Sequence, residues 1–197
     1  MTNAVVLLAA GSLKGAFIPL LAGFHQQSGI RVEAHFGPAG LLRERIEGGA
    51  ACSVFASANR QHPQALRQAG RAGECYSFAR NQLMLTARRA ACDDRADWLA
   101  LLTNPQLRLA TSTPGAWLIR EGLTDLFIGY AHYASQMTMA DDLRTVTIPA
   151  PWNIQADYQL TTLDESAGAQ RLCRFILGAE GQQYLQAAGF LPANAES

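Results

Sequence analysis

Apolar and polar positions along the first 70 residues alternate between two patterns, one typical of buried strands and one typical of helices. Ala4–Ala10 is a continuous apolar run, as expected of a strand covered on both faces. Leu13–Gln27 follows with apolar residues at helical spacing. The alternation continues with strands at Ile30–Phe36 and Ser53–Ser57 and helices at Leu41–Glu47 and about 63–69. This order predicts a right-handed parallel α/β sheet.

The remaining sequence continues the mixture with weaker periodicity. Strands are predicted at Asn81–Ala87, Leu107–Ser112, Leu126–Tyr130, Thr145–Ile148 and Asp157–Leu163, and helices at Asp97–Leu102 and Ala167–Ala188, the last broken near Gly178. Two extended stretches, Ser77–Ala87 and Ala156–Leu163, could instead be crossings between two α/β lobes. We expect an α/β protein with mostly parallel sheets and helices on both faces.

Charge and length exclude several classes of function. The 197 residues carry 16 basic and 16 acidic side chains, so no net field attracts nucleic acid or an anionic membrane. No apolar run approaches the roughly 20 residues of a membrane span. The first residues have no basic n-region and do not form a secretory signal, so the protein is cytosolic or a signal has been removed.

Metal and cofactor chemistry are not expected. The four cysteines form no CxxC pair and are interpreted as small buried hydrophobes: Cys52, Cys75, Cys92 and Cys173. The four histidines share no metal-ligand spacing and are interpreted as surface or core residues: His25, His35, His62 and His132. We therefore predict no cofactor and no metal ligand.

The first strand ends in Gly11-Ser12, directly before the first helix. This order places Ser12 at a helix N-cap on the carboxyl edge of the sheet, where ligands of open α/β sheets bind. A helix start offers unpaired N–H groups and the positive end of a dipole. Taken alone, the motif fits a plain capping serine as well as an anion contact.

The same arrangement recurs in two more loops. Gly37–Gly40 and Thr111–Gly115 each end a strand and open the next segment, and none of the three loops contains Asp, Glu, His or Cys. A site made only of donors suits a fully deprotonated oxyanion, whose oxygens all accept. A monoprotonated phosphate would leave its proton unpaired, at a cost of roughly 1–3 kcal/mol. The loops predict a binder of small, unprotonated oxyanions.

Successive motifs resemble those of molybdate- and tungstate-binding proteins of ABC importers. They are AAGSLKGAF, FGPAGLLRERIEGGAACSVFASAN, FARNQLMLTAR, LATSTPGA and TDLFIGYAHYA, and the match runs in order from about Ala4 to Phe190. The resemblance implies the type II periplasmic-binding-protein fold, with two lobes joined by crossing strands. It also implies a molybdate or tungstate ligand in the inter-lobe cleft, an importer permease as partner and a periplasmic location.

The resemblance also suggests ligand-binding residues. Ser12 matches the first-loop serine whose hydroxyl and N–H hold the anion, and Ala39 stands where the second-loop serine would be. Ala58 matches a backbone N–H position, and Tyr130 resembles a tyrosine that reaches the anion from the second lobe, although Tyr130 could also be a core or crossing-strand aromatic. The loop pattern itself adds the N–H groups near Ser112.

The sequence departs from the family pattern at several places. Ala39 lacks the hydroxyl, and Ser53 and Asn59 stand where the family usually has Asp. TSTPGA runs almost directly into WLIREG, where the resembling proteins have several tens of residues. We assign residues 1–80 and 160–197 to lobe 1 and residues 81–159 to lobe 2, which is shortened or incompletely represented near 116–117.

The combined interpretation is a solute-binding protein without a chemical step. A cytosolic anion-sensing or effector-binding domain is an alternative, because no signal precedes the first strand and the cysteines are expected to be free thiols. An enzyme is a weaker alternative. The fold also hosts catalysts, but the three loops offer only hydroxyls and no general base.

Overall fold

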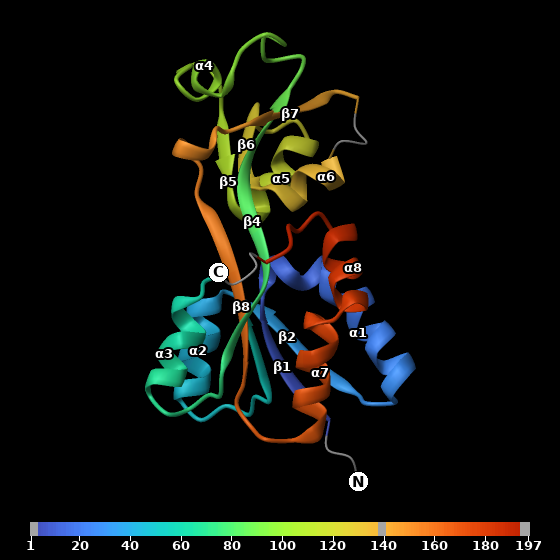
Figure 1. Ribbon diagram of the computed structural model, residues 1–197. Coiled ribbons are helices and arrows are strands. Elements are labelled where there is room, and N and C mark those ends of the chain that lie inside the picture. Colours follow the sequence, from blue (N-terminus) through green and yellow to red (C-terminus); the bar gives the residue numbers. More distant parts are fainter. Residues whose placement is uncertain (1–3, 138–140, 194–197) are drawn as a thin grey trace. The chain divides into compact units, whose positions relative to one another are not determined.

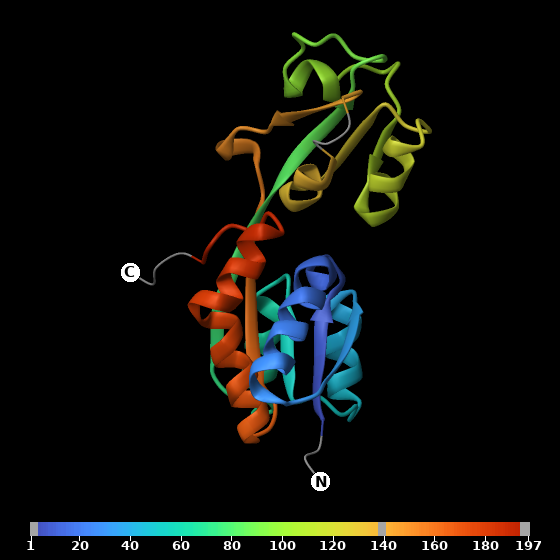
Figure 2. The same ribbon diagram turned by 90° about the vertical axis from the view of Figure 1, so that its right-hand side faces the viewer.

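The computed structural model describes residues 4–137 and 141–193, which divide into two compact units (Figures 1 and 2). Unit 1 comprises residues up to 80 and from 156 onward, and unit 2 comprises residues 81–155. The chain therefore leaves unit 1 once and returns to it once. Each unit is described by itself below.

Unit 1 is built on a mixed sheet in the order β2-β1-β3-β8-β4. Its strands are β1 (Val5–Ala10), β2 (Val32–Gly37), β3 (Val54–Ser57), β8 (Gln155–Thr162) and the first part of β4 (Cys75–Arg88). Strand β1 pairs in parallel with β2 and β3, as the strand–helix order predicts. Strand β8 pairs antiparallel with β3, so the expected parallel arrangement does not extend to it.

Helices cover both faces of the unit 1 sheet, as expected (Figure 1). The helical elements are η1 (Gly11–Leu13), α1 (Lys14–Ser28), α2 (Ala39–Glu47), α3 (Gln61–Gln68), α7 (Ala167–Leu177) and α8 (Ala179–Ala187). On one face, α1, α7 and α8 bury an apolar cluster that includes Phe17, Leu172 and Leu185. On the other face, α2 and α3 bury Leu42, Ile46 and Leu66 against the sheet.

Unit 2 has a smaller sheet built around the second part of β4. Its other strands are β5 (Leu109–Thr111), β6 (Leu126–Tyr130) and β7 (Leu143–Thr147). Strand β4 pairs antiparallel with both β6 and β7, while β5 and β6 form the parallel pair. The sheets are thus parallel at β1–β3 and β5–β6, and antiparallel where β4, β7 and β8 join them.

The helices of unit 2 are short and enclose two small apolar clusters. They are α4 (Trp98–Leu102), α5 (Ser112–Arg120), α6 (Ala131–Met137) and the single turn η2 (Ala150–Trp152). Phe127 is buried between α5 and the sheet, and a Cβ built at Gly115 would lie 2.6 Å from its ring. Glycine at position 115 therefore allows α5 to pack directly on the aromatic ring. The sequence pattern did not predict helix α6.

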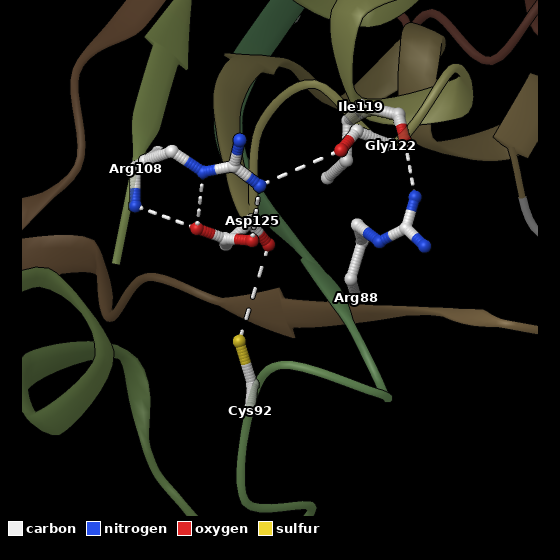
Figure 3. Close-up of polar contacts among 6 residues, drawn as sticks. All are labelled: Arg88, Cys92, Arg108, Ile119, Gly122 and Asp125. Carbon is white, nitrogen blue, oxygen red and sulfur yellow. Dashed lines mark hydrogen bonds and ion pairs between the residues drawn. The ribbon is translucent and has the colours of Figure 1, made fainter. Parts of the chain in front are cut away.

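An ion pair joins the amino ends of the two parallel strands of unit 2 (Figure 3). Asp125 precedes β6 and accepts hydrogen bonds from Nε and Nη2 of Arg108, which precedes β5, at 3.0 and 2.9 Å. The backbone N–H of Arg108 donates to the same carboxylate at 2.9 Å. The Arg108 side chain thereby holds the pKa of Asp125 below its usual value.

The cysteines and His132 take ordinary structural positions. All four thiols are free, and burial raises the pKa of Cys52 and Cys173 to about 12, so both stay protonated at neutral pH. His132 is buried in unit 2, where Nδ2 of Asn81 lies 2.8 Å from its Nδ1 and desolvation lowers its pKa to about 4. In the described part of the chain, no helix is long and apolar enough to cross a bilayer.

Candidate functional site

Three strand–helix connections of unit 1 end at the same edge of its sheet. The parallel register pairs Ala10 with Gly37 and Ala9 with Ala56, so the chain leaves β1, β2 and β3 at neighbouring positions. The first two connections nearly touch, because a Cβ built at Gly11 would lie 3.9 Å from the carbonyl oxygen of Gly37. Two of the three loops predicted to converge, those after β1 and β2, therefore lie side by side in unit 1, while the third, Thr111–Gly115, belongs to unit 2.

Ser12 lies in the first connection, but it does not cap a helix. The single turn η1 begins after Ala10, and α1 begins at Lys14, so Ser12 sits inside the turn and its side chain caps neither element. Its Oγ instead lies 2.9 Å from the hydroxyl oxygen of Tyr158. The N-cap interpretation was wrong because this tertiary hydrogen bond replaces the local one.

Tyr158 brings a second hydroxyl to this edge from the antiparallel strand β8. The register pairs Gln159 with Ser57, so Tyr158 lies just past the carboxyl end of β3. Its ring is fully buried and makes edge-on contacts with Phe78 and Phe190 at centroid distances of 6.1 and 5.3 Å. The sequence analysis missed Tyr158. The available signal was a tyrosine in an apolar strand, whose buried hydroxyl needs a polar partner.

The second connection presents the first turn of α2 without a side-chain cap. Pro38 occupies the N-cap and supplies no hydrogen-bonding side chain, so the amides of Ala39 and Gly40 have no acceptor within the helix. Helices α4 and α7 differ, because Asp97 and Ser166 accept hydrogen bonds from their first turns. The start of α2 thus offers free backbone donors, whereas α4 and α7 each use a capping side chain to satisfy a donor of their own first turn.

The third connection carries Ala58 between β3 and α3. The Ser57 hydroxyl donates to the carbonyl of Asn59 at 2.7 Å and accepts from its N–H at 3.1 Å, which folds the loop tightly. The side chain of Asn59 then accepts from the N–H of Gln61 at 2.9 Å. Ala58 is half-buried at the tip of this turn. Asn59, where the family pattern has Asp, therefore has a structural role at the start of α3.

The two predicted residues of unit 2 share the corresponding edge of its own sheet. Thr111 of β5 pairs with Ile128 of β6, so Ser112, the first residue of α5, and Tyr130, the last residue of β6, follow at the carboxyl ends of parallel strands. No side chain caps α5. The structure brings Ser12, Ala39 and Ala58 together in unit 1, and Ser112 and Tyr130 together in unit 2.

The three connections of unit 1 carry no acidic side chain. They comprise Gly11–Leu13, Pro38–Gly40 and Ala58–Arg60, and the two cations at these connections, Arg60 in the third and Lys14 directly after the first, are both exposed. Among residues 4–137 and 141–193, no group of three or more His, Cys, Asp or Glu side chains could hold a metal ion. An edge with hydroxyls, open amides and no carboxylate can donate hydrogen bonds to an anion.

These features place the chain in the class of α/β proteins whose strand–helix connections meet at the carboxyl edge of a parallel sheet, the edge where ligands of such folds bind. A family comparison gives the same class. The chain belongs to the bacterial extracellular solute-binding proteins, whose family model matches residues 5–117 and 114–191. Membership implies a small ligand and the permease of an ABC importer as partner.

Relatives and solved structures agree with this assignment. An uncharacterized protein of Pasteurella multocida is 33% identical over 239 residues, covering 95% of this chain and 98% of the relative. The periplasmic molybdate-binding protein of Azotobacter vinelandii superposes with a TM-score of 0.78 at 20% identity, covering 96% of this chain and all of the other. The sulfate-binding protein of Mycobacterium tuberculosis gives 0.77 at 15% identity, covering 97% and 87%. The chain thus has the periplasmic-binding-protein fold.

Proposed function

We propose that this protein binds a small, fully deprotonated oxyanion, molybdate, tungstate or a similar dianion, as the substrate-binding component of an importer. The anion would lie at the carboxyl edge of β1, β2 and β3, on the amides of the uncapped turns and the hydroxyl of Ser12. The absence of Asp and Glu from these connections supports a ligand that only accepts hydrogen bonds. Sulfate has the same charge as molybdate and is also tetrahedral, so binding measurements must identify which of these dianions is the ligand.

The Ser12–Tyr158 hydroxyl pair carries this proposal. When Tyr158 donates to Ser12 Oγ, the Ser12 proton is directed to another acceptor, and Ser12 is only half-buried. An oxyanion oxygen beside the turn is such an acceptor. The buried ring of Tyr158 cannot move without disturbing its contacts with Phe78 and Phe190. Tyr158 would therefore hold Ser12 in the orientation that donates to the ligand.

Unit 2 contributes Ser112 and Tyr130 in this proposal, on the strength of the family resemblance. Both follow parallel strands at one edge of the unit 2 sheet. Substituting Tyr130 by Phe tests this part separately. An unchanged affinity would remove Tyr130 from the ligand contacts and leave the unit 1 edge as the whole of the tested site.

We also propose that unit 2 is shorter than in related proteins. The family model matches in two segments that meet at residues 114–117, inside α5. The alignment with the Pasteurella multocida relative spans 239 positions, at least 42 more than the 197 residues of this chain. Helix α5 runs without interruption from Ser112 to Arg120. A shorter unit 2 would supply fewer contacts to the anion and would weaken its binding.

No chemical step is part of the proposed function. The connections of unit 1 hold no carboxylate, imidazole or thiol that could act as a general base or nucleophile on a bound anion. Binding would take place outside the cytoplasm, before delivery to the permease. Fractionation of cells that express the full-length gene tests this location.

Calorimetric titration with sodium molybdate, tungstate, sulfate and phosphate tests the function. We expect Ser12→Ala to weaken binding by about 1.5–3 kcal/mol, because a hydrogen bond to a charged ligand is lost. Tyr158→Phe should weaken it less, since Ser12 remains. Ser28→Ala is the matched control, because Ser28 ends α1 and donates to the carbonyl of Phe24. Equal affinities for the wild type and Ser12→Ala would overturn the proposal.

A further inference from the structure

One imidazole lies against the first turn of α2. His62 is the second residue of α3, and its Cε1 and Nε2 would lie 3.7 and 3.9 Å from a Cβ built at Gly40. Because Gly40 has no side chain, the ring faces the backbone of the turn whose amides are uncapped. His62 therefore adjoins the second connection of the proposed anion site, beside the position where Ala39 offers no hydroxyl.

A nitrogen of this ring makes no hydrogen bond. Nδ1 of His62 is shielded from solvent and has no partner among the described residues. A buried nitrogen without a hydrogen-bond partner destabilises the fold, so the place of His62 between α2 and α3 is not explained by local stability. The ring as a whole is half-buried and is reached by solvent. It can therefore exchange a proton with the solvent.

The charged groups that act on His62 come from α2. They are Arg43 and Glu47, whose Nε and Oε1 lie 3.1 Å apart in an ion pair. Desolvation and Arg43 lower the pKa of His62 below its usual 6.5, and Glu47 opposes them. Histidine is the side chain whose ordinary pKa lies between about pH 5 and 8, so His62 is the member of this group expected to change charge there.

We propose that His62 is a charge-tuning residue of the anion site, which adds a positive charge beside the start of α2 when it is protonated. This inference rests on the proposed function and specifies how the same site responds to proton concentration. A cation beside the amides of α2 acts in the same direction as the helix dipole and attracts a dianion. The neutral ring leaves only the backbone donors.

The direction of the pH dependence of anion binding follows from the linkage between ligand binding and protonation of His62. A bound dianion favours the imidazolium and raises the pKa of His62, so the affinity must rise as pH falls through the titration of the bound form. The affinity stops rising below the pKa that His62 has in the protein without ligand. An increase in affinity of about three- to tenfold corresponds to an increase of about half to one unit in the His62 pKa on binding.

The test is calorimetric titration of sodium molybdate from pH 8 to pH 5, where molybdate remains largely a dianion. We expect the wild type to bind about three- to tenfold more tightly at the acidic end. His62→Gln should bind as the wild type does at pH 8 and show no further gain. His62→Lys should have the tighter affinity throughout. His25→Gln is the control, because His25 lies in the last turn of α1, at the end away from Ser12. This variant should keep the wild-type dependence of affinity on pH.

A second measurement does not depend on any variant. The imidazole pKa of His62, followed by NMR in the wild type, should rise on addition of molybdate. An unchanged pKa, or the same pH profile in His62→Gln and the wild type, overturns the inference. If molybdate binds and Ser12→Ala weakens it while the profile stays flat, only the role of His62 fails. If no dianion binds at any pH, the proposed function fails and His62 loses its role with it.

Discussion

The sheet edges of the two units are built differently. In unit 1, three strand–helix connections lie side by side, and an antiparallel strand adds a buried tyrosine that holds the Ser12 hydroxyl. In unit 2, one parallel pair of strands is followed by α5 and α6, and the ion pair of Arg108 with Asp125 lies at the amino ends of β5 and β6.

This difference separates the parts that we propose bind the anion from the parts that stabilise the fold. Unit 1 leaves the start of α2 open, while its large apolar cluster supplies the stability. Unit 2 divides its core into two small clusters and ties its strands with an ion pair at the end away from Ser112 and Tyr130.

The largest effect is expected from a matched pair of core substitutions, Phe17→Ala in unit 1 and Phe127→Ala in unit 2. Each ring is buried, so each variant should lose about 3–5 kcal/mol of unfolding free energy. All three tryptophans, Trp98, Trp117 and Trp152, belong to unit 2, so tryptophan fluorescence reports on that unit. In urea, Phe127→Ala should lower the fluorescence midpoint more than Phe17→Ala does.

Circular dichroism of the same samples follows the helices of both units. If the units unfold separately, fluorescence and dichroism should give different midpoints in at least one variant. Identical midpoints by both probes in both variants would mean that the units unfold together. The comparison between two separate cores would then be wrong.

A smaller effect is expected from Asp125→Asn. The carboxylate accepts two hydrogen bonds from the Arg108 side chain, which lower its pKa below 3.8 in the folded state. Its stabilisation is therefore present above the unfolded pKa and is lost as pH falls through the folded value. The variant should have a lower urea midpoint than the wild type at pH 7, and the difference should shrink towards pH 3. A constant difference would argue against the ion pair.

The smallest effect is expected from Ala39→Ser, which places a hydroxyl on the first turn of α2. If the anion lies at this turn, molybdate affinity should rise by about 1 kcal/mol, because one donor to a charged ligand is added. Ala69→Ser, at the exposed carboxyl end of α3, is the control and should change nothing. A loss of affinity in Ala39→Ser would mean that the ligand approaches too closely for a larger side chain.

The sequence contained enough to predict the strand–helix order and the α/β fold class. The apolar run of β1 and the helical spacing of α1 are local signals, and each corresponds to a described element. Helix α6 was not predicted because Ala131–Met137 is only seven residues long and shows no complete apolar stripe. The antiparallel pairing of β8 depends on its contacts with β3, which is distant in the sequence, so no local pattern indicates it.

The candidate site was predictable in its loops and not in its side-chain partners. The small residues at Gly11, Pro38 and Ala58 indicate where the chain turns at the sheet edge. The hydrogen bond between the Ser12 and Tyr158 hydroxyls spans 146 residues, and the contact of His62 with Gly40 depends on the packing of α2 against α3. Such pairs follow from tertiary structure, so a capping serine and a surface or core histidine were the natural local interpretations.

The position of β8 in the unit 1 sheet has a consequence for biosynthesis. Strand β8 lies between β3 and β4, yet it leaves the ribosome only after the whole of residues 81–155. A nascent chain can therefore complete unit 2, which is continuous, while the first three strands still wait for their neighbour. The hydroxyl of Tyr158 can reach Ser12 only after residues 81–155 have been synthesised, so the edge proposed to bind the anion is completed after unit 2.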